Sequence, residues 1–127
     1  MIRLLIADDE KMEREALADI VMRRFEHEVT VEMAENGRKA ADTAVLWGAD
    51  LILMDIEMTF MDGMSAAEEI RRADPEVLII FITNSPQYAI KGYAVQALDY
   101  ILKPLSYYAF CQRMNHVREL LEQYIPT

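Results

Sequence analysis

Short apolar runs that end at a charged residue are the feature that most constrains the fold of this chain. Three such runs lead directly into Asp8, Asp55 and Lys103. Runs of this length, separated by stretches with helical spacing, are typical of buried parallel strands. The carboxyl ends of parallel strands meet at one edge of a sheet, where α/β proteins usually bind their ligands. We therefore expect these three side chains to lie close together.

Strand-like runs alternate with helical segments along the whole chain. Strands are predicted at residues 4–7, 29–33, 51–54, 77–82 and 99–102. Helices are predicted around residues 12–23, 38–47, 65–73, 87–95 and 106–124. This alternation favours a parallel sheet with right-handed crossovers and helices on both faces. The predicted fold class is α/β, a flavodoxin-like (βα)5 three-layer sandwich with strand order 2-1-3-4-5, in which the first and third strands flank the switch point.

Several predicted helices carry chemical signals at their ends. Ser65 with Glu68 forms a capping-box pattern, so the third helix is expected to begin at Ser65. Gly48 is a typical terminator for the second helix, and Ser106 is a typical cap for the fifth. Gly92 interrupts the fourth helix and should weaken it.

Length and composition limit what the chain can do. Its 127 residues suffice for one domain, which we assign to residues 1–124, with 125–127 as a tail or the cut end of a longer protein. A net charge of -9 argues against direct nucleic-acid contact by this segment. The single cysteine cannot form an internal disulfide, and no apolar stretch suits a membrane span. Without the features of a signal peptide, a cytoplasmic location is expected.

Carboxylates that converge at one sheet edge predict a site for a divalent cation. Asp8, Asp9 and Asp55 would repel each other strongly unless a cation joined them. Mg²⁺ is a hard ion that prefers such oxygen ligands. The ammonium group of Lys103 would be a second cation beside the carboxylates. The space that remains suits a phosphoryl group. A plainer alternative is that Asp8 and Asp9 cap the first helix.

Four pieces of the sequence resemble the receiver domain of two-component response regulators. They are residues 5–10, residues 54–58 followed by Asp62 and Gly63, residues 81–83, and residues 99–104. Each piece alone is weak evidence for the resemblance, but four pieces in the correct order and with the correct spacing are strong evidence. The resemblance covers essentially the whole chain.

The resemblance implies that Asp55 is the phosphoacceptor, which takes a phosphoryl group from a phosphohistidine of a sensor histidine kinase. Asp9 and Asp55 would each give Mg²⁺ one carboxylate oxygen, and Glu57 its backbone carbonyl. Asp8 would act mainly through a metal-bound water, and Lys103 would help to neutralise the transferred group. The chain would then be no conventional enzyme, but a signalling domain that catalyses its own phosphorylation and dephosphorylation.

The resemblance also implies a conformational switch. Thr83 stands at the family's hydroxyl position, which bonds the phosphoryl group, and Tyr100 stands at its aromatic position. A cis Lys103-Pro104 peptide is predicted, because an X-Pro bond adopts the cis form at modest cost and receivers generally use it to aim the lysine. The fourth helix, fifth strand and fifth helix would form the output face and the candidate homodimer interface.

Two residues depart from the family's pattern. Thr59 stands where the family usually has proline, so the loop that carries Glu57 should be less rigid. Asn84 stands where a small alanine or glycine is usual. We expect it to narrow the access of water and alter the dephosphorylation rate.

The type of output stays open at this point. Residues 86–89, 92–93 and 97–100 resemble receivers joined to LytTR-type DNA-binding domains, whereas residues 7–10 look more like those joined to AraC-type domains. Either output implies regulation of transcription through a DNA-binding domain absent from this chain.

Two other functions remain as alternatives. One is a pseudo-receiver, an interaction module that works without phosphorylation. The other is an aspartyl-phosphate hydrolase of the haloacid dehalogenase type. That enzyme needs a second aspartate two residues after the nucleophile of its first strand, whereas Glu10 occupies this position after Asp8.

Overall fold

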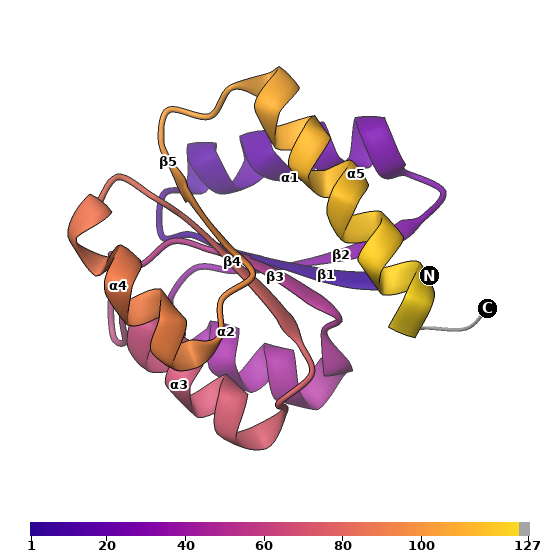
Figure 1. The fold of residues 1–127 in the computed structure, drawn as a ribbon. Helices are drawn as coiled ribbons and strands as arrows, with labels where there is room; N and C mark the ends of the chain where they lie inside the picture. Colours follow the sequence, from indigo (N-terminus) through magenta and orange to yellow (C-terminus); the bar gives the residue numbers. More distant parts are fainter. Residues whose placement is uncertain (125–127) are drawn as a thin grey trace.

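A parallel sheet of five strands organises the chain in the computed structural model, which describes residues 1–124 (Figure 1). The strands are β1 (Ile2–Ala7), β2 (Val29–Ala34), β3 (Leu51–Met54), β4 (Leu78–Thr83) and β5 (Asp99–Leu102). Their order is β2-β1-β3-β4-β5, and every neighbouring pair is parallel. The predicted fold class and strand order are confirmed. The predicted tail at residues 125–127 lies outside the described residues.

Helices cover both faces of the sheet. One face carries α1 (Lys11–Phe25) and α5 (Tyr107–Tyr124), and the other carries α2 (Gly37–Thr43), α3 (Gly63–Ala73) and α4 (Ala89–Gly92) (Figure 1). The π-helical turn η1 (Ala44–Gly48) extends α2, and the 3-10 turns η2 (Pro86–Tyr88) and η3 (Tyr93–Val95) flank α4. The result is the three-layer arrangement that right-handed crossovers produce.

The central strands are buried on both faces, which explains why their sequences are apolar without alternation. In β1, Leu4 and Ile6 belong to the core beneath α1 and α5, whereas Leu5 and Ala7 belong to the core beneath α2 and α3. The side chains of β3, and those of β1 from Leu4 onward, are therefore occupied by packing. Most of the polar chemistry is left to the residues that follow each strand, apart from Thr83 at the end of β4.

The start of the third helix corrects a prediction. The helix begins at Gly63 and not at Ser65, because Asp62 is its N-cap. The Asp62 side chain accepts a hydrogen bond from the backbone N–H of Ser65 at a donor–acceptor distance of 2.7 Å. The backbone N–H of Ser65 is thus capped by Asp62. The predicted capping box of Ser65 with Glu68 is wrong.

The fourth helix is shorter than predicted. Only Ala89–Gly92 is α-helical, and the turns on either side of it are 3-10. Gln96, with φ of 55°, ends the segment in the left-handed conformation. The other two end signals are confirmed: Gly48 has φ of 78°, and the hydroxyl of Ser106 accepts from the N–H of Ala109 at 3.3 Å.

Gly63 fixes the loop between β3 and α3 by a close backbone approach. A Cβ at this position would lie 2.0 Å from the backbone oxygen of Asp55. The N–H of Gly63 also donates to the carbonyl of Ile56 at 2.7 Å. The position of the backbone around Asp55 therefore depends on a residue without a side chain.

We expect Gly63→Ala to lower the free energy of unfolding by about 3 kcal/mol, because the new methyl group overlaps backbone that cannot yield cheaply. Urea unfolding followed by circular dichroism measures this loss. Gly92→Ala is the matched control, since its Cβ would meet only ordinary contacts at 3.7 and 3.8 Å. The control should be neutral or slightly stabilising, and equal losses in both variants would contradict the account.

Candidate functional site

Three charged side chains follow strand ends and meet at one edge of the sheet. Asp8 follows β1, Asp55 follows β3 and Lys103 follows β5. Because β1 and β3 are paired, the N–H of Asp55 donates to the carbonyl of Ala7 at 2.9 Å, which sets the two aspartates side by side. Both are buried, with exposures of 6% for Asp8 and 7% for Asp55. The predicted convergence is observed.

Lys103 lies between the two aspartates. Its Nζ is 2.9 Å from Asp8 Oδ2 and 2.9 Å from Asp55 Oδ2, and it also bonds the carboxylate of Glu13. The other oxygen of Asp55, Oδ1, accepts from the N–H of Ile56 at 2.6 Å. One ammonium group thus donates hydrogen bonds to three carboxylates. The Lys103-Pro104 peptide is cis, as predicted.

The site shifts the pKa values of its own members. Burial alone lowers the pKa of Lys103, but the hydrogen bonds that its ammonium donates to Glu13, Asp55 and Asp8 outweigh burial and raise that pKa above its usual value. Lys103 therefore stays charged. Burial raises the pKa of Asp8, although hydrogen bonds from the Glu10 N–H and from Lys103 offset part of the effect. Ionised Asp8 is thus held at a cost in free energy.

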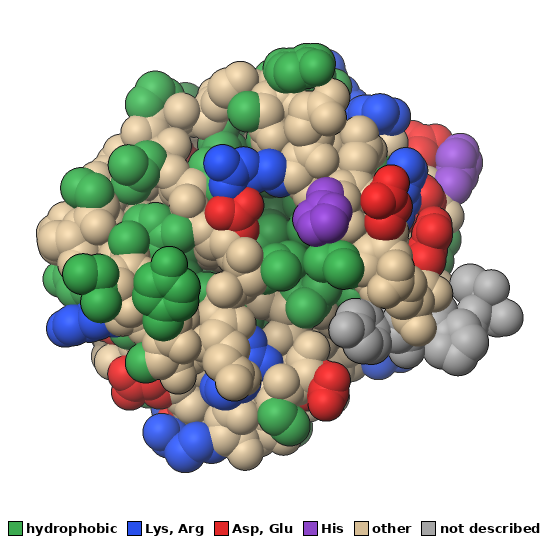
Figure 2. Space-filling view, in the orientation of Figure 1, with side chains coloured by type: hydrophobic (Ala, Val, Ile, Leu, Met, Phe, Trp, Pro, Cys, Tyr) green, Lys and Arg blue, Asp and Glu red, His purple; other side chains and the backbone are tan. Residues whose placement is uncertain are grey.

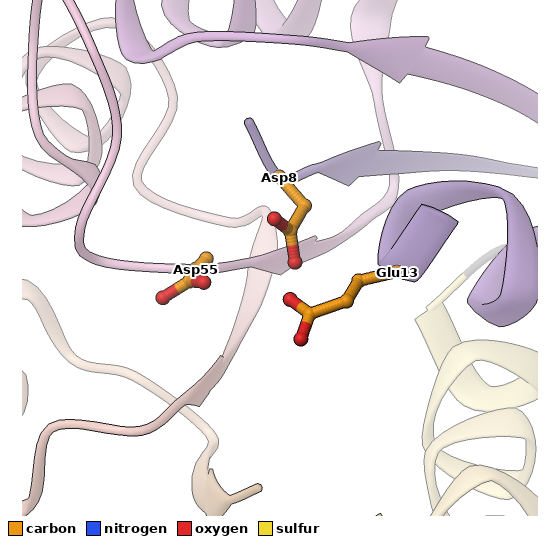
Figure 3. A group of neighbouring side chains, drawn as sticks. All are labelled: Asp8, Glu13 and Asp55. Atoms are coloured by element: carbon orange, nitrogen blue, oxygen red, sulfur yellow. The ribbon is translucent and has the colours of Figure 1, made fainter. Parts of the chain in front are cut away.

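Glu13 completes a group of oxygen donors around the aspartates. Asp8, Glu13 and Asp55 each offer a carboxylate oxygen, and these oxygens lie within 4.8 Å of one another (Figure 3). A hard divalent cation such as Mg²⁺ prefers ligands of this kind, so the donor set fits the ion. Sequence reasoning missed Glu13. The available signal was an acidic residue in the first turn of the helix that follows the aspartate pair.

An open polar pocket of about 560 Å³ lies over Asp55. The residues around it include the remaining predicted members of the site and both departures from the family's pattern: Asp9, Glu57, Thr59, Thr83 and Asn84. The pocket is large enough to admit a phosphoryl group beside the carboxylate. Asp9 is half-buried, whereas Thr59 and Asn84 are exposed.

Thr83 and Tyr100 lie on adjacent strands behind this pocket. Thr83 ends β4 and is fully buried. Tyr100 is half-buried on β5, with its ring centroid 6.0 Å from that of Phe81. The Tyr100 hydroxyl donates to the backbone carbonyl of Ser85. Burial raises the pKa of Tyr100, so its hydroxyl stays protonated and able to donate. Sequence reasoning did not single out Ser85.

We expect Lys103→Met to lower the free energy of unfolding at pH 7 by about 3 kcal/mol, because it leaves buried carboxylates without their cation. Urea unfolding in the presence of a chelator measures this loss. Added Mg²⁺ should restore part of it, since an ion can join the same carboxylates.

Lys39→Met is the control for removing a lysine. Lys39 Nζ lies 3.0 Å from Glu35 Oε2, but both side chains are largely exposed. Its replacement should change the free energy of unfolding by no more than about 0.5 kcal/mol. If the two variants lose the same stability, Lys103 does not hold the cluster together.

A family model described as the response regulator receiver domain matches residues 4–115 of the chain. The sensory transduction protein LytT of Bacillus subtilis is 30% identical over 127 residues, which cover 100% of this chain and 52% of that protein. LytT of Oceanobacillus iheyensis is 32% identical over 122 residues, covering 94% of this chain and 49% of that protein. The chain therefore spans about half the length of these relatives.

Solved structures share the architecture. The REC domain of AraT, a response regulator from Geobacillus stearothermophilus, has a TM-score of 0.86 at 32% identity and covers 97% of each chain. The response regulator TrrA of Thermotoga maritima, solved in complex with Mg²⁺-BeF, has a TM-score of 0.80 at 28% identity, covering 91% of this chain and 98% of that chain. Within residues 1–124, no helix is long and apolar enough to cross a membrane.

Proposed function

Because this chain belongs to the response regulator receiver domain family, we propose that Asp55 is its phosphoacceptor and that a histidine kinase is the donor. Receiver domains of response regulators interact with histidine kinases, and they are signalling domains rather than classical enzymes. The observation that carries the proposal is the position of Asp55. Its carboxylate is buried beside Asp8, bonded to Lys103, and open to a polar pocket.

The proposed reaction is a phosphoryl transfer to a carboxylate. An oxygen of Asp55 attacks the phosphorus of a phosphohistidine, and the bond from phosphorus to the histidine nitrogen breaks with its electron pair leaving on that nitrogen. The products are an acyl phosphate on Asp55 and a free histidine. Hydrolysis of the acyl phosphate by water from the pocket would return the domain to its starting state.

Carboxylates of this chain would hold the magnesium ion that receiver domains generally bind. Asp9 and Asp55 would each supply one carboxylate oxygen, and Glu57 its backbone carbonyl. Asp8, whose oxygens already bond Lys103 and the Glu10 N–H, would act through a bound water. When bound, Mg²⁺ neutralises negative charge on the phosphoryl oxygens.

Lys103 and Thr83 would stabilise the transferred group from the protein side. The Lys103 ammonium, already 2.9 Å from Asp55, is placed to share one phosphoryl oxygen. Thr83 lines the pocket, and its hydroxyl would donate to another phosphoryl oxygen. Phosphoryl transfer requires such stabilisation, because negative charge spreads over the equatorial oxygens of the phosphoryl group in the transition state.

The proposed output surface comprises α4, β5 and α5, and Tyr100 is one of the residues of β5. Exposed hydrophobic side chains gather over α4 and the start of α5 (Figure 2), among them Ile90, Tyr93 and Tyr108 at 81%, 83% and 73% exposure. A homodimer through this surface would cover them. The similarity to LytT proteins favours a LytTR-type DNA-binding output domain over an AraC-type one. The protein would then regulate transcription in the cytoplasm.

We expect incubation with acetyl phosphate and Mg²⁺ to add one phosphoryl group to the native protein and none to Asp55→Asn, as intact mass will show. Asp55→Asn removes the nucleophile but keeps the size of the side chain. Asp50→Asn is the control, because Asp50 lies at the opposite end of β3 and its acceptor role toward the Arg3 N–H survives in an amide.

Two outcomes would contradict the proposal. An adduct that persists in Asp55→Asn would place the phosphoryl group elsewhere. A folded native protein that gains no phosphoryl group under any condition would favour the pseudo-receiver.

A further inference from the structure

Lys103 uses all three protons of its ammonium group within the site. It donates to Asp8 Oδ2 and to Asp55 Oδ2 at 2.9 Å each, and to the carboxylate of Glu13. An ammonium group has three N–H donors and no more. A phosphoryl oxygen on Asp55 therefore gains a hydrogen bond from Lys103 only when one of the three carboxylates gives one up.

Glu13 is the carboxylate that Lys103 can release at the lowest cost. Its side chain is 45% exposed, so water can solvate the carboxylate after release. Asp8 is buried, and without the ammonium it would be left as an unpaired buried charge. Asp55 carries the phosphoryl group in the proposed reaction and so stays beside Lys103. Partly exposed ion pairs contribute much less to stability than buried ones, which again makes Glu13 the partner to lose.

The place of Glu13 in its helix does not by itself account for this contact. An acidic residue in the first turn of a helix is favoured by the helix dipole, whatever lies nearby. Glu13, however, bonds a lysine that lies 90 residues further along the chain. Its carboxylate points from α1 toward Asp8 and Asp55 (Figure 3), and the residue lines the polar pocket over Asp55. Glu13 thus reaches Lys103 across the fold and borders the space that a phosphoryl group would enter.

We propose that Glu13 is a positioning residue that holds Lys103 in the unphosphorylated domain and competes with the phosphoryl group for it. The inference rests on the proposed function and concerns how readily Asp55 is phosphorylated. The bond between Glu13 and Lys103 stabilises the free site, and it is lost when the ammonium turns to the phosphoryl group. A contact made only in the unphosphorylated state shifts the equilibrium toward that state. Glu13 therefore opposes phosphorylation of Asp55.

Binding of fluoroberyllate, a phosphoryl mimic, at saturating Mg²⁺ tests this competition, and fluorine NMR measures the bound mimic. Glu13→Gln keeps the length of the side chain and removes its charge, so it should bind fluoroberyllate about fivefold more tightly than the native protein does. Glu10→Gln is the matched control, because it removes the same charge from the same pocket. Within the described residues, Lys103 bonds Glu13 but not Glu10. The control should change the affinity by less than about twofold.

A spectroscopic readout separates this positioning role from a purely structural one. In the native protein, fluoroberyllate should shift the NMR signals of the Lys103 ammonium nitrogen and the Glu13 carboxylate carbon together. The Glu13 signal should move toward that of Glu15, a solvated carboxylate on the same helix that lies 4.0 Å from Lys11 Nζ. The affinity for Mg²⁺ without the mimic is measured for the same variants, because Glu13 is also one of the oxygen donors of the cluster.

The outcomes distinguish the inference from the function on which it rests. A native protein that binds no fluoroberyllate in the presence of Mg²⁺ would overturn the proposed function and the inference with it. Native binding together with an unchanged or weaker affinity in Glu13→Gln, an equal gain in Glu10→Gln, or a Glu13 signal that the mimic leaves in place would overturn the inference alone. So would a Mg²⁺ affinity lowered by about tenfold or more in Glu13→Gln, because Glu13 would then act on the metal and not on Lys103.

Discussion

A single ammonium group between two buried carboxylates is the interaction on which the site depends. Lys103 reaches Asp8 and Asp55 at equal distances of 2.9 Å and bonds Glu13 as well. These contacts join the ends of β1, β3 and β5, which are not all neighbours in the sheet. They also leave negative charge in excess. A cluster of this kind is stable only while its cation is in place, and it favours any further cation that enters.

The same imbalance makes the site responsive. Adding a phosphoryl group to Asp55 changes the local charge and creates new acceptors, whereas the packed strands beneath cannot shift easily. Under the proposed function, the change would pass through polar contacts at the sheet edge. Those contacts include the hydrogen bonds of Ser85 with Thr83, Glu57 and Tyr100. A rigid core and an adjustable polar edge are what a two-state signalling element requires.

How much the sequence could predict follows from how each residue is positioned. The convergence of Asp8 and Asp55 was predictable, because strand ends are placed by topology alone. The cap by Asp62 was missed because Ser65 carries a similar signal within the same turn. Glu13 and Ser85 were missed for a different reason. Their roles depend on how far a side chain reaches across the fold, and neither periodicity nor spacing encodes that distance.

The most direct test of the account is the free energy of unfolding of the native protein and of Asp8→Asn at pH 7, with a chelator and with Mg²⁺. Folding raises the pKa of Asp8, so its ionisation costs stability at neutral pH, and this cost disappears as the pH falls through the folded-state pKa. With chelator, Asp8→Asn should be the more stable protein. Mg²⁺ at a hundredfold excess over its Kd should stabilise the native protein by about 2.7 kcal/mol and the variant by much less. A less stable variant in chelator, or equal stabilisation of both by Mg²⁺, would contradict the account.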